Sequence, residues 1–246
     1  MTMKPENVIR FEHVRKVYGE NVILPDFNLE IGRGEFLTVI GSSGSGKTTM
    51  LKMINGLILP DAGAVYVDDK PVCDTDLIAL RRNIGYVIQS IGLFPHMTVA
   101  QNIAYVPGLS RQWDRQEMRE MTRNLVEVVG MDKDMLSRYP SELSGGQQQR
   151  VGIARALAAN PDILLMDEPF GAVDEITRHQ LQDEIKSIHG RRDVTIVFVT
   201  HDIREALKLG TRVLVMHDGE IMQCAAPEEI EANPANEFVK QLVSME

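Results

Sequence analysis

Hydrophobic positions along the chain form short runs that alternate with helical patterns. Residues 36–40, 163–166 and 195–199 are apolar or β-branched almost throughout, which is typical of strands buried on both faces. Further strands are expected at residues 28–31, 64–67, 84–88 and 213–216, and helices at 47–55, 177–188 and 203–209. Strands that alternate with helices predict an α/β fold with a mainly parallel sheet core.

The pattern changes between residues 90 and 158. Three helical segments are expected there, at residues 98–105, 114–129 and 144–158, and no convincing strand lies among them. We interpret this stretch as a helical subdomain inserted into the α/β core. Near the end, Asp218-Gly219 separates two apolar runs, which predicts a β-hairpin. Residues 1–246 are therefore expected to form a single domain.

Composition and charge narrow the class of protein. The 246 residues are 43% hydrophobic, as in ordinary globular domains, and the net charge of -9 disfavours nucleic acid as the main partner. No apolar run reaches the roughly 18 residues of a membrane helix, and residues 1–10 lack the apolar core of a secretory signal. Cys73 and Cys224 are far apart in the sequence and form no C-x-x-C motif, which indicates unpaired thiols in a reducing compartment. A soluble protein of the cytosol is expected.

A phosphate-binding motif follows the strand at 36–40 and opens a helix. Its residues match G-x-x-x-x-G-K-[ST] at each fixed position: Gly41, Ser42, Ser43, Gly44, Ser45, Gly46, Lys47 and Thr48. The glycines leave the backbone N–H groups open to phosphate oxygens, and the helix start adds its own N–H groups. Lys47 is expected to contact the β- and γ-phosphates, and Thr48 to offer its hydroxyl to Mg²⁺. The alternative is a Gly/Ser-rich turn with a chance lysine, which the strand–loop–helix order disfavours.

Two acids end the apolar strand at 163–166. Acids at the carboxyl end of a parallel strand point into the crevice where ligands of open α/β sheets bind. We expect Asp167 to hold Mg²⁺ and Glu168 to act as the general base on the attacking water. Taken alone, the pair is equally consistent with a solvated strand end before Pro169.

A second segment suited to an anion lies at Leu143-Ser-Gly-Gly-Gln. Ser144 can cap the following helix, and Gly145 and Gly146 leave its first N–H groups open. An ordinary helix cap is the simpler interpretation of this segment alone. The chain thus has two phosphate-type sites but only one phosphate loop. A closed two-fold dimer would explain this, if the Ser-Gly-Gly segment of each chain contacts the nucleotide bound by the other chain.

These motifs resemble those of the ATP-binding cassette family, and the resemblance covers essentially the whole chain. It implies a P-loop ATPase with an antiparallel β subdomain beside the parallel core. It also implies further roles: Tyr18 stacks on adenine, Gln89 senses Mg²⁺ and water, Asp174 lies in the dimer-contact loop, and His201 contacts the γ-phosphate. Thr49 and Gln147, next to the two phosphate motifs, are included among the nucleotide contacts. Tyr18, Gln89 and His201 each have, when taken alone, a plain structural interpretation as a core, solvated or capping side chain.

The single cassette without a membrane span resembles ATPase subunits of bacterial importers. The partners implied are two permease subunits at the cytoplasmic face of the inner membrane and, indirectly, a solute-binding protein. The segments 87–99 and 168–178 resemble osmoprotectant importers for glycine betaine, carnitine, choline or proline betaine. Many of those ATPases continue into paired regulatory domains, which are not expected within these 246 residues. The sequence is either a shorter relative or a truncated one, so regulation through such domains is not assumed. Import of another small polar solute such as an amino acid, a non-transport ATPase of the same family, and a small-molecule phosphotransferase are the alternatives.

The apolar loop at 91–97 follows Gln89. It is interrupted by Gly92 and Pro95, so it is not expected to be helical. Two interpretations remain open. The loop packs against its own helical subdomain, or it forms a partly exposed apolar groove that receives a permease helix.

Overall fold

The computed structural model describes residues 6–110 and 113–244 and divides into two compact units. One unit joins Met1–Arg81 to Asp193–Glu246, and the other is Arg82–Arg192. Of the N-terminal stretch in which no secretory signal is expected, residues 1–5 lie outside the described part. The prediction that the whole chain is one nucleotide-binding domain stays a prediction.

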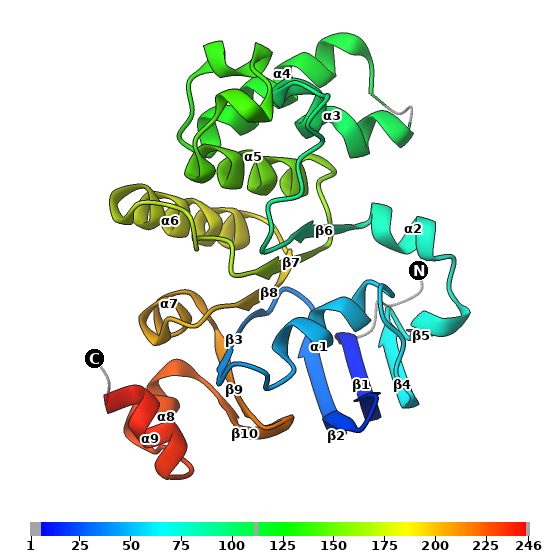
Figure 1. Cartoon of the computed structure of the whole chain (residues 1–246), viewed down its shortest axis with the longest axis vertical. Helices are drawn as coiled ribbons and strands as arrows, with labels where there is room; N and C mark the ends of the chain where they lie inside the picture. The colour runs from blue at the N-terminus through cyan, green and yellow to red at the C-terminus, as the bar shows by residue number, and fades with distance from the viewer. Residues whose placement is uncertain (1–5, 111–112, 245–246) are drawn as a thin grey trace. The chain divides into compact units, whose positions relative to one another are not determined.

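The first unit contains an antiparallel sheet with the strand order β2-β1-β4-β5 (Figure 1). Its strands are β1 (Asn7–Tyr18), β2 (Asn21–Gly32), β4 (Ala62–Val67) and β5 (Lys70–Pro71). A two-residue turn joins β1 to β2, and Gly19 adopts there a φ of 60°, which glycine allows without strain. This sheet is the antiparallel β part that the family resemblance implies.

The same unit contains four neighbouring strands in the order β10-β9-β3-β8. They are β3 (Phe36–Gly41), β8 (Thr195–Val199), β9 (Arg212–His217) and β10 (Glu220–Ala225). β3 pairs with both β8 and β9 in parallel, as their continuous apolar sequences predict. β10 returns antiparallel through a turn in which Asp218 and Gly219 have φ of 47° and 80°, so the predicted hairpin is confirmed.

Helices of this unit pack on the parallel strands. They are α1 (Lys47–Ile54), α7 (Ile203–Leu209), α8 (Pro227–Ala232) and α9 (Glu237–Ser244); α2 (Leu77–Arg82) and a short 3-10 helix (Val72–Asp74) follow the antiparallel sheet. Ile230 of α8 and Val239 of α9 are fully buried in one cluster with Ile40 of β3 and Val213 and Val215 of β9. The C-terminal helices therefore share a core with the strand that leads into the phosphate loop.

The second unit combines two parallel strands with helices. β6 (Ile84–Val87) pairs with β7 (Ile163–Asp167). The helices are α3 (Val99–Ser110), α4 (Arg115–Val128), α5 (Gly145–Ala158) and α6 (Glu175–Arg191), with short 3-10 helices at Lys133–Ser137 and Pro140–Glu142. α3, α4 and α5 pack against one another, and no strand lies between β6 and β7 in the described residues (Figure 1).

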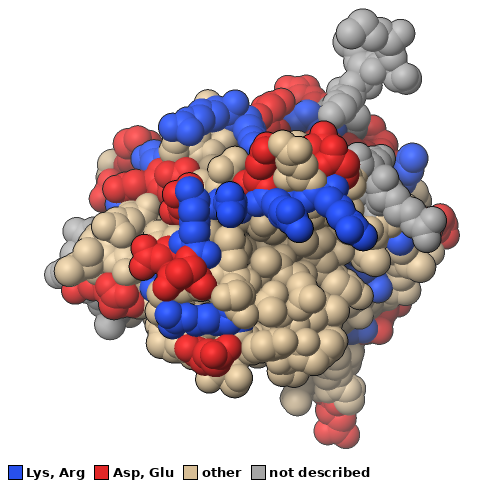
Figure 2. All heavy atoms as spheres, turned by 90° about the horizontal axis from the view of Figure 1, so that it is seen from above, with Lys and Arg blue, Asp and Glu red and all other residues tan. Residues whose placement is uncertain are grey.

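The helices expected to begin at Thr98, Asp114 and Ser144 begin one residue later, because these three residues are N-caps. The side chain of each cap accepts from a backbone N–H of the first turn. The backbone N–H of each cap donates to the side chain of the residue three positions later. The view in Figure 2 shows Lys and Arg side chains beside Asp and Glu, next to an uncharged area.

Within residues 6–110 and 113–244, the structure contains no helix with the length and apolar character that crossing a membrane requires.

Candidate functional site

The phosphate motif forms a tight loop between β3 and α1, as predicted. Gly41 has a φ of 150°, and a Cβ there would lie 1.9 Å from the carbonyl oxygen of Met216 in β9. Gly46 has a φ of 94°, and its Cβ would lie 2.8 Å from Cδ2 of Leu24 in β2. Both positions therefore require glycine, for conformation and for space.

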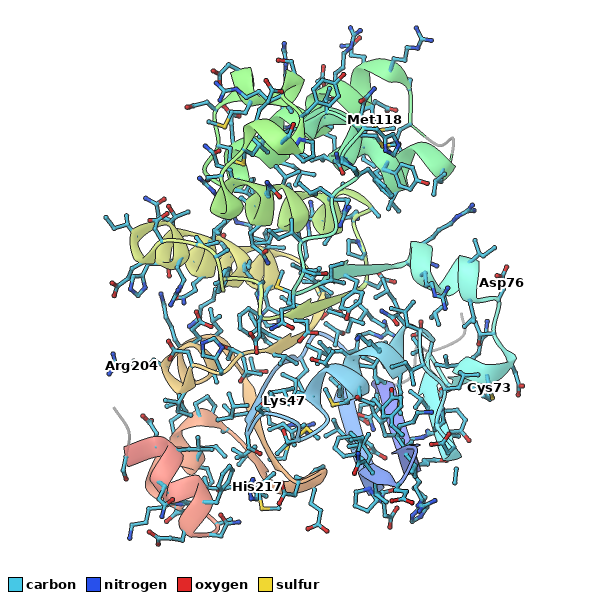
Figure 3. The ribbon with its side chains drawn as sticks, in the orientation of Figure 1. Lys47, Cys73, Asp76, Met118, Arg204 and His217 are labelled. Atoms are coloured by element: carbon cyan, nitrogen blue, oxygen red, sulfur yellow. The ribbon has the colours of Figure 1, made fainter. Side chains whose placement is uncertain are left out.

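Lys47 lies at the centre of this loop (Figure 3). Its Nζ donates to the carbonyl oxygens of Gly41 at 2.8 Å and Ser42 at 2.7 Å. No side chain caps α1 at Gly46, and the first turn of α1 contains no acidic residue. The helix start, the lysine and the glycine backbone together provide positive charge and N–H donors suited to phosphate oxygens. Thr48 and Thr49 lie in that first turn, and Ser43 and Gly44 are exposed at the loop's surface.

Tyr18 ends β1 with 46% of its surface exposed, so part of this side chain is accessible to a ligand. The ammonium of Lys16 lies 5.4 Å from the ring centroid. Lys16 in turn donates to Asp61 at 3.0 Å and to the carbonyl of Leu59 at 2.9 Å, and Asp61 also accepts from the N–H of Val17 at 2.7 Å. Asp61 thus fixes both the lysine and the backbone next to Tyr18.

His201 is exposed directly after β8, at the same sheet edge as the phosphate loop. The preceding residue, Thr200, is fixed by two hydrogen bonds. The N–H of Thr200 donates to the carbonyl of Val39 at 3.1 Å, and the hydroxyl of Thr200 donates to the buried Glu205 at 2.6 Å. Asp202 on the other side caps α7. The histidine is therefore held between two fixed neighbours.

In the second unit, the carboxylate pair ends β7 as predicted. Asp167 is 3% exposed, and Glu168 adopts a φ of 48°, an uncommon conformation for a residue with a side chain. Gln89 donates from Nε2 to Oε2 of Glu168 at 3.0 Å, so these two predicted residues contact each other directly. Burial, and then the charge of Asp167, raise the pKa of the nearby Tyr86 hydroxyl.

Ser144 is the N-cap of α5, and its hydroxyl accepts from the N–H of Gln147 at 3.3 Å. The N–H of Ser144 in turn donates to Oε1 of Gln147 at 2.9 Å. A Cβ on Gly146 would lie 2.9 Å from the carbonyl oxygen of Ala172, so this segment lies against the turn that precedes Asp174. Asp174 caps α6 by accepting from the N–H of Thr177 at 3.0 Å, and this bond, more than any other contact, lowers the pKa of Asp174.

The loop at 91–97 is half-buried to exposed and is held by two side chains. Asn102, which is fully buried, accepts from the N–H of Phe94 and donates to the carbonyls of Phe94 and Met97. Arg155 donates to the carbonyl of Gly92 at 2.8 Å, and its guanidinium lies 5.8 Å from the Phe94 ring. The loop packs on its own helices and still leaves part of its apolar surface exposed.

Predicted metal ligands are the Thr48 hydroxyl in the first unit and Gln89 and Asp167 in the second. No group of three His, Cys, Asp or Glu residues that could hold a metal ion occurs in the described part of the chain. The predicted set has a single carboxylate, which is typical of Mg²⁺ bound together with phosphate and water rather than in an all-protein cage.

The family model described as "ABC transporter" matches residues 24–171, which is more than half of the chain. The chain belongs to the ABC transporter family. The ATP-binding cassette fold expected from the sequence is thereby confirmed.

Curated relatives of this ABC chain are transport ATP-binding proteins. The glycine betaine/carnitine/choline transport ATP-binding protein of Bacillus subtilis is 51% identical over 97% of this chain and 63% of its own length. The glycine betaine uptake system ATP-binding protein of Escherichia coli is 49% identical over 95% of this chain and 76% of its own. This chain spans less than two thirds of the length of several relatives it matches.

Solved structures agree with the classification. A dimeric structure of the ATP-binding cassette MJ0796 in a post-hydrolysis state, bound to ADP and Pi, has a TM-score of 0.84 and 36% identity. It covers 89% of this chain and 98% of the other.

Four side chains that support the site had no signal in the sequence. Lys16 and Asp61 belong to strand and turn segments of ordinary composition, and Glu205 looks like a surface helix residue until its burial is known. His217 had no metal-type spacing, yet its Nδ1 lies 3.0 Å from Oγ of Ser42. The contacts of Lys16 with Asp61 and of Ser42 with His217 join residues over 40 positions apart, and the burial of Glu205 depends on tertiary packing, so local patterns predict none of them.

Proposed function

We propose that this chain is the ATP-hydrolysing subunit of a bacterial importer for quaternary-amine osmoprotectants such as glycine betaine, carnitine, choline or proline betaine. The observation that carries the ATPase part is the phosphate loop, with Lys47 inside it and the uncapped start of α1 beside it. The osmoprotectant part is supported by relatives of about half identity that are named for glycine betaine, carnitine or choline.

ATP would bind with its phosphates in the loop and its adenine on the open face of Tyr18. Backbone N–H groups from Gly41 to Thr49 and the ammonium of Lys47 would neutralise the phosphate charge. Asp61 and Leu59 hold the ammonium of Lys16 over one face of the Tyr18 ring, so adenine would stack on the opposite face.

Mg²⁺ would be held by the hydroxyl of Thr48, the carboxylate of Asp167 and the amide oxygen of Gln89, together with phosphate oxygens. These are the hard oxygen ligands that the ion prefers. Gln89 donates to Glu168 through Nε2, so its Oε1 remains as the acceptor. When bound, the ion would offset charge on the transferred phosphoryl group.

Glu168 would accept the proton of the attacking water as general base. Its contact with Gln89 orients the carboxylate. His201 would donate a hydrogen bond to the γ-phosphate from its fixed position between Thr200 and Asp202.

Two chains would complete each site. The capped start of α5 in one chain, at Ser144, Gly145, Gly146 and Gln147, would face the γ-phosphate held by the loop of its partner, with Asp174 at the contact between chains. This arrangement is supported by the dimeric form of the solved cassettes.

The chain would act at the cytoplasmic face of the inner membrane on two permease subunits, supplied by an extracytoplasmic solute-binding protein. The exposed part of the loop at 91–97, together with the exposed Tyr105 and Leu109 of α3, would receive a permease helix. Gln89 adjoins this loop, so docking and hydrolysis would be coupled there.

Glu168→Gln tests the catalytic assignment. The variant keeps a hydrogen-bonding side chain of the same size but loses the base, so ATP should bind while hydrolysis falls at least about 100-fold, in the range expected of a lost general base. Phosphate release measures turnover, and size-exclusion chromatography with ATP should show a trapped dimer. Hydrolysis at the native rate would show that Glu168 is not the base. Phosphate passed to an acceptor instead of water would indicate a phosphotransferase.

Import of a polyamine is the second candidate. A spermidine/putrescine import ATP-binding protein of Haemophilus influenzae is 40% identical over 99% of this chain. Uptake of labelled glycine betaine, carnitine and spermidine can be measured in cells that carry the chain and the permeases encoded next to it. An osmoprotectant importer should take up glycine betaine or carnitine but not spermidine, and a polyamine importer should do the reverse. Recovery of the chain with nucleic acid and no membrane protein would contradict both.

A further inference from the structure

The end of β9 lies directly against the start of the phosphate loop. Gly41 pairs with Met216 in parallel register, and the carbonyl of Met216 occupies the space where a Cβ on Gly41 would lie. The next residue of each strand is therefore brought to its neighbour: Ser42 enters the loop, and His217 ends β9. This adjacency is built into the sheet and does not depend on a flexible side chain.

His217 makes a side-chain contact to the loop itself. Its Nδ1 lies 3.0 Å from Oγ of Ser42, while its Nε2 faces Asp218 at 3.5 Å. A hydroxyl can donate or accept, so this contact persists with either tautomer of the ring. The backbone of Ser42 is held as well, because its carbonyl accepts from Lys47 and from the N–H of Ser45. Ser42 is thus fixed by Lys47 on its backbone and by His217 on its side chain.

The ring of His217 is also stacked on Phe238 of α9. The two centroids are 4.2 Å apart with 28° between the ring planes. Phe238 packs against the buried cluster that contains Ile40, the residue just before the loop. In Figure 3, His217 lies beside the β9–β10 hairpin, close to α9. The contacts form a continuous path from α9 through Phe238 and His217 to Ser42.

We propose that His217 is a positioning residue for the phosphate loop, and that it couples the loop to the seating of the C-terminal helix α9 through Phe238. This proposal rests on the proposed function, since it assigns the loop to nucleotide phosphates. His217 would act by holding Ser42 in the conformation that the phosphates require. A shift of α9 would loosen this contact and weaken nucleotide binding.

Two substitutions separate the two nitrogens of the ring. The side-chain amide of His217→Asn places a polar atom where Nδ1 lies, whereas that of His217→Gln places one where Nε2 lies. Binding of a fluorescent ADP analogue with Mg²⁺ should weaken about three- to tenfold in His217→Ala, the range of one lost hydrogen bond. His217→Asn should restore most of the affinity and His217→Gln should not. A purely structural role would make both replacements equivalent.

A double-mutant cycle with Ser42 tests the contact. Ser42→Ala alone should weaken binding, and adding His217→Ala should change it by roughly twofold or less, since the contact is already lost. Full additivity would overturn the proposal. His179→Ala, on the exposed face of α6, is the matched histidine control and should bind like wild type.

A second cycle tests the link to α9. Phe238→Leu keeps an apolar side chain but removes the stacked ring, so it should weaken ADP binding in the wild type and have little further effect in His217→Ala. Leu242→Ala removes another contact of α9 with the same cluster and should lower the melting temperature without changing affinity. Equal effects of Phe238→Leu and Leu242→Ala on affinity would overturn the coupling.

The wild-type measurement distinguishes the two proposals. If the wild-type chain binds neither ATP nor ADP, the proposed function fails. If it binds both and His217→Ala binds equally well, only the positioning role of His217 is overturned. In hydrolysis assays, His217→Ala should raise KM for ATP with kcat little changed, since the residue acts on binding.

Discussion

Asp61 connects a surface turn to the adenine side of the site. Its carboxylate accepts from the N–H of Val17 and from the ammonium of Lys16, which lies beside the ring of Tyr18. These bonds, that from Val17 first and that from Lys16 second, lower the pKa of Asp61 below its ordinary value. A carboxylate whose pKa is lower in the folded than in the unfolded chain stabilises the fold when it is ionised.

Asp61→Asn should therefore destabilise the protein in a pH-dependent way. The stabilisation is fully present above the unfolded pKa of about 3.9 and is lost as the pH falls through the lower folded value. The variant should melt a little below wild type at pH 7, and the difference should vanish at the most acidic pH at which the protein stays folded. The effect is small because the carboxylate is exposed and screened. Thermal unfolding followed by circular dichroism measures it.

Asp132→Asn is the control for this experiment. Asp132 is exposed and makes no side-chain hydrogen bond or ion pair within the described part of the chain. Its replacement should leave the melting temperature unchanged across the pH range. A pH-independent loss in Asp61→Asn would mean that the geometry, not the charge, of Asp61 stabilises the turn.

The phosphate loop could be predicted from the sequence because its chemistry depends on residues that are neighbours in the chain. Gly41, Gly46 and Lys47 lie within seven positions of one another, and both the glycine requirement and the lysine placement follow from one loop. The contact of His217 with Ser42 spans 175 positions and exists only because β3 and β9 pair. Local patterns do not contain that pairing.

Among the elements, helix caps combine a structural and a proposed functional role. Ser144 caps α5 in the same way that Asp114 caps α4, each with a residue three positions on that completes a capping box. Only the cap of α5 would also meet a phosphate. The two helices therefore form a matched pair. Removing the cap of α4 measures the effect of a lost cap on stability alone, so any additional effect of removing the cap of α5 can be assigned to catalysis.

Ser144→Ala and Asp114→Ala should each lower the free energy of unfolding by about 0.5–2 kcal/mol, the usual cost of a lost N-cap. Ser144→Ala should also reduce ATP hydrolysis strongly, whereas Asp114→Ala should not. Ser144→Gly sharpens the comparison, because glycine costs a cap only a few tenths of a kcal/mol and still lacks the hydroxyl. Urea unfolding and phosphate release are the measurements. Hydrolysis at the native rate by Ser144→Gly would show that the Ser144 hydroxyl has no role in catalysis.

The predicted elements were most accurate where one apolar period continues without interruption. β7, β8 and α7 lie within a residue of their expected positions. β1 was not predicted as a separate strand, because register shifts and a φ of 48° at His13 interrupt its alternation. The first half of β2, which contains Pro25 and exposed polar residues, was also missed. In both strands, pairing with a neighbour overrides a weak local preference.

At the scale of the whole molecule, one chain carries one phosphate loop and one Ser-Gly-Gly helix start. The sequence predicted both motifs, but their assignment to different nucleotides rests on the proposed two-fold dimer. Lys47 and Glu168 would serve the same ATP from one chain, whereas Ser144 would serve the ATP of the partner. This difference between residues that act on their own chain's nucleotide and residues that act across the dimer makes the assembly testable without a structure of the complex.

Mixing inactive variants should restore activity only for a pair that acts across the dimer. In a dimer of two Lys47→Ala chains both phosphate loops are defective, and in a dimer of two Ser144→Arg chains both α5 helix starts are blocked. A mixed dimer has one site with both defects and one intact site, so equal amounts that exchange freely should regain about a quarter of wild-type hydrolysis. Lys47→Ala mixed with Glu168→Gln is the matched control. These defects fall on different sites of the mixed dimer, so each site keeps one defect and no activity should return. Equal behaviour of the two mixtures would show that each chain hydrolyses ATP with its own residues alone.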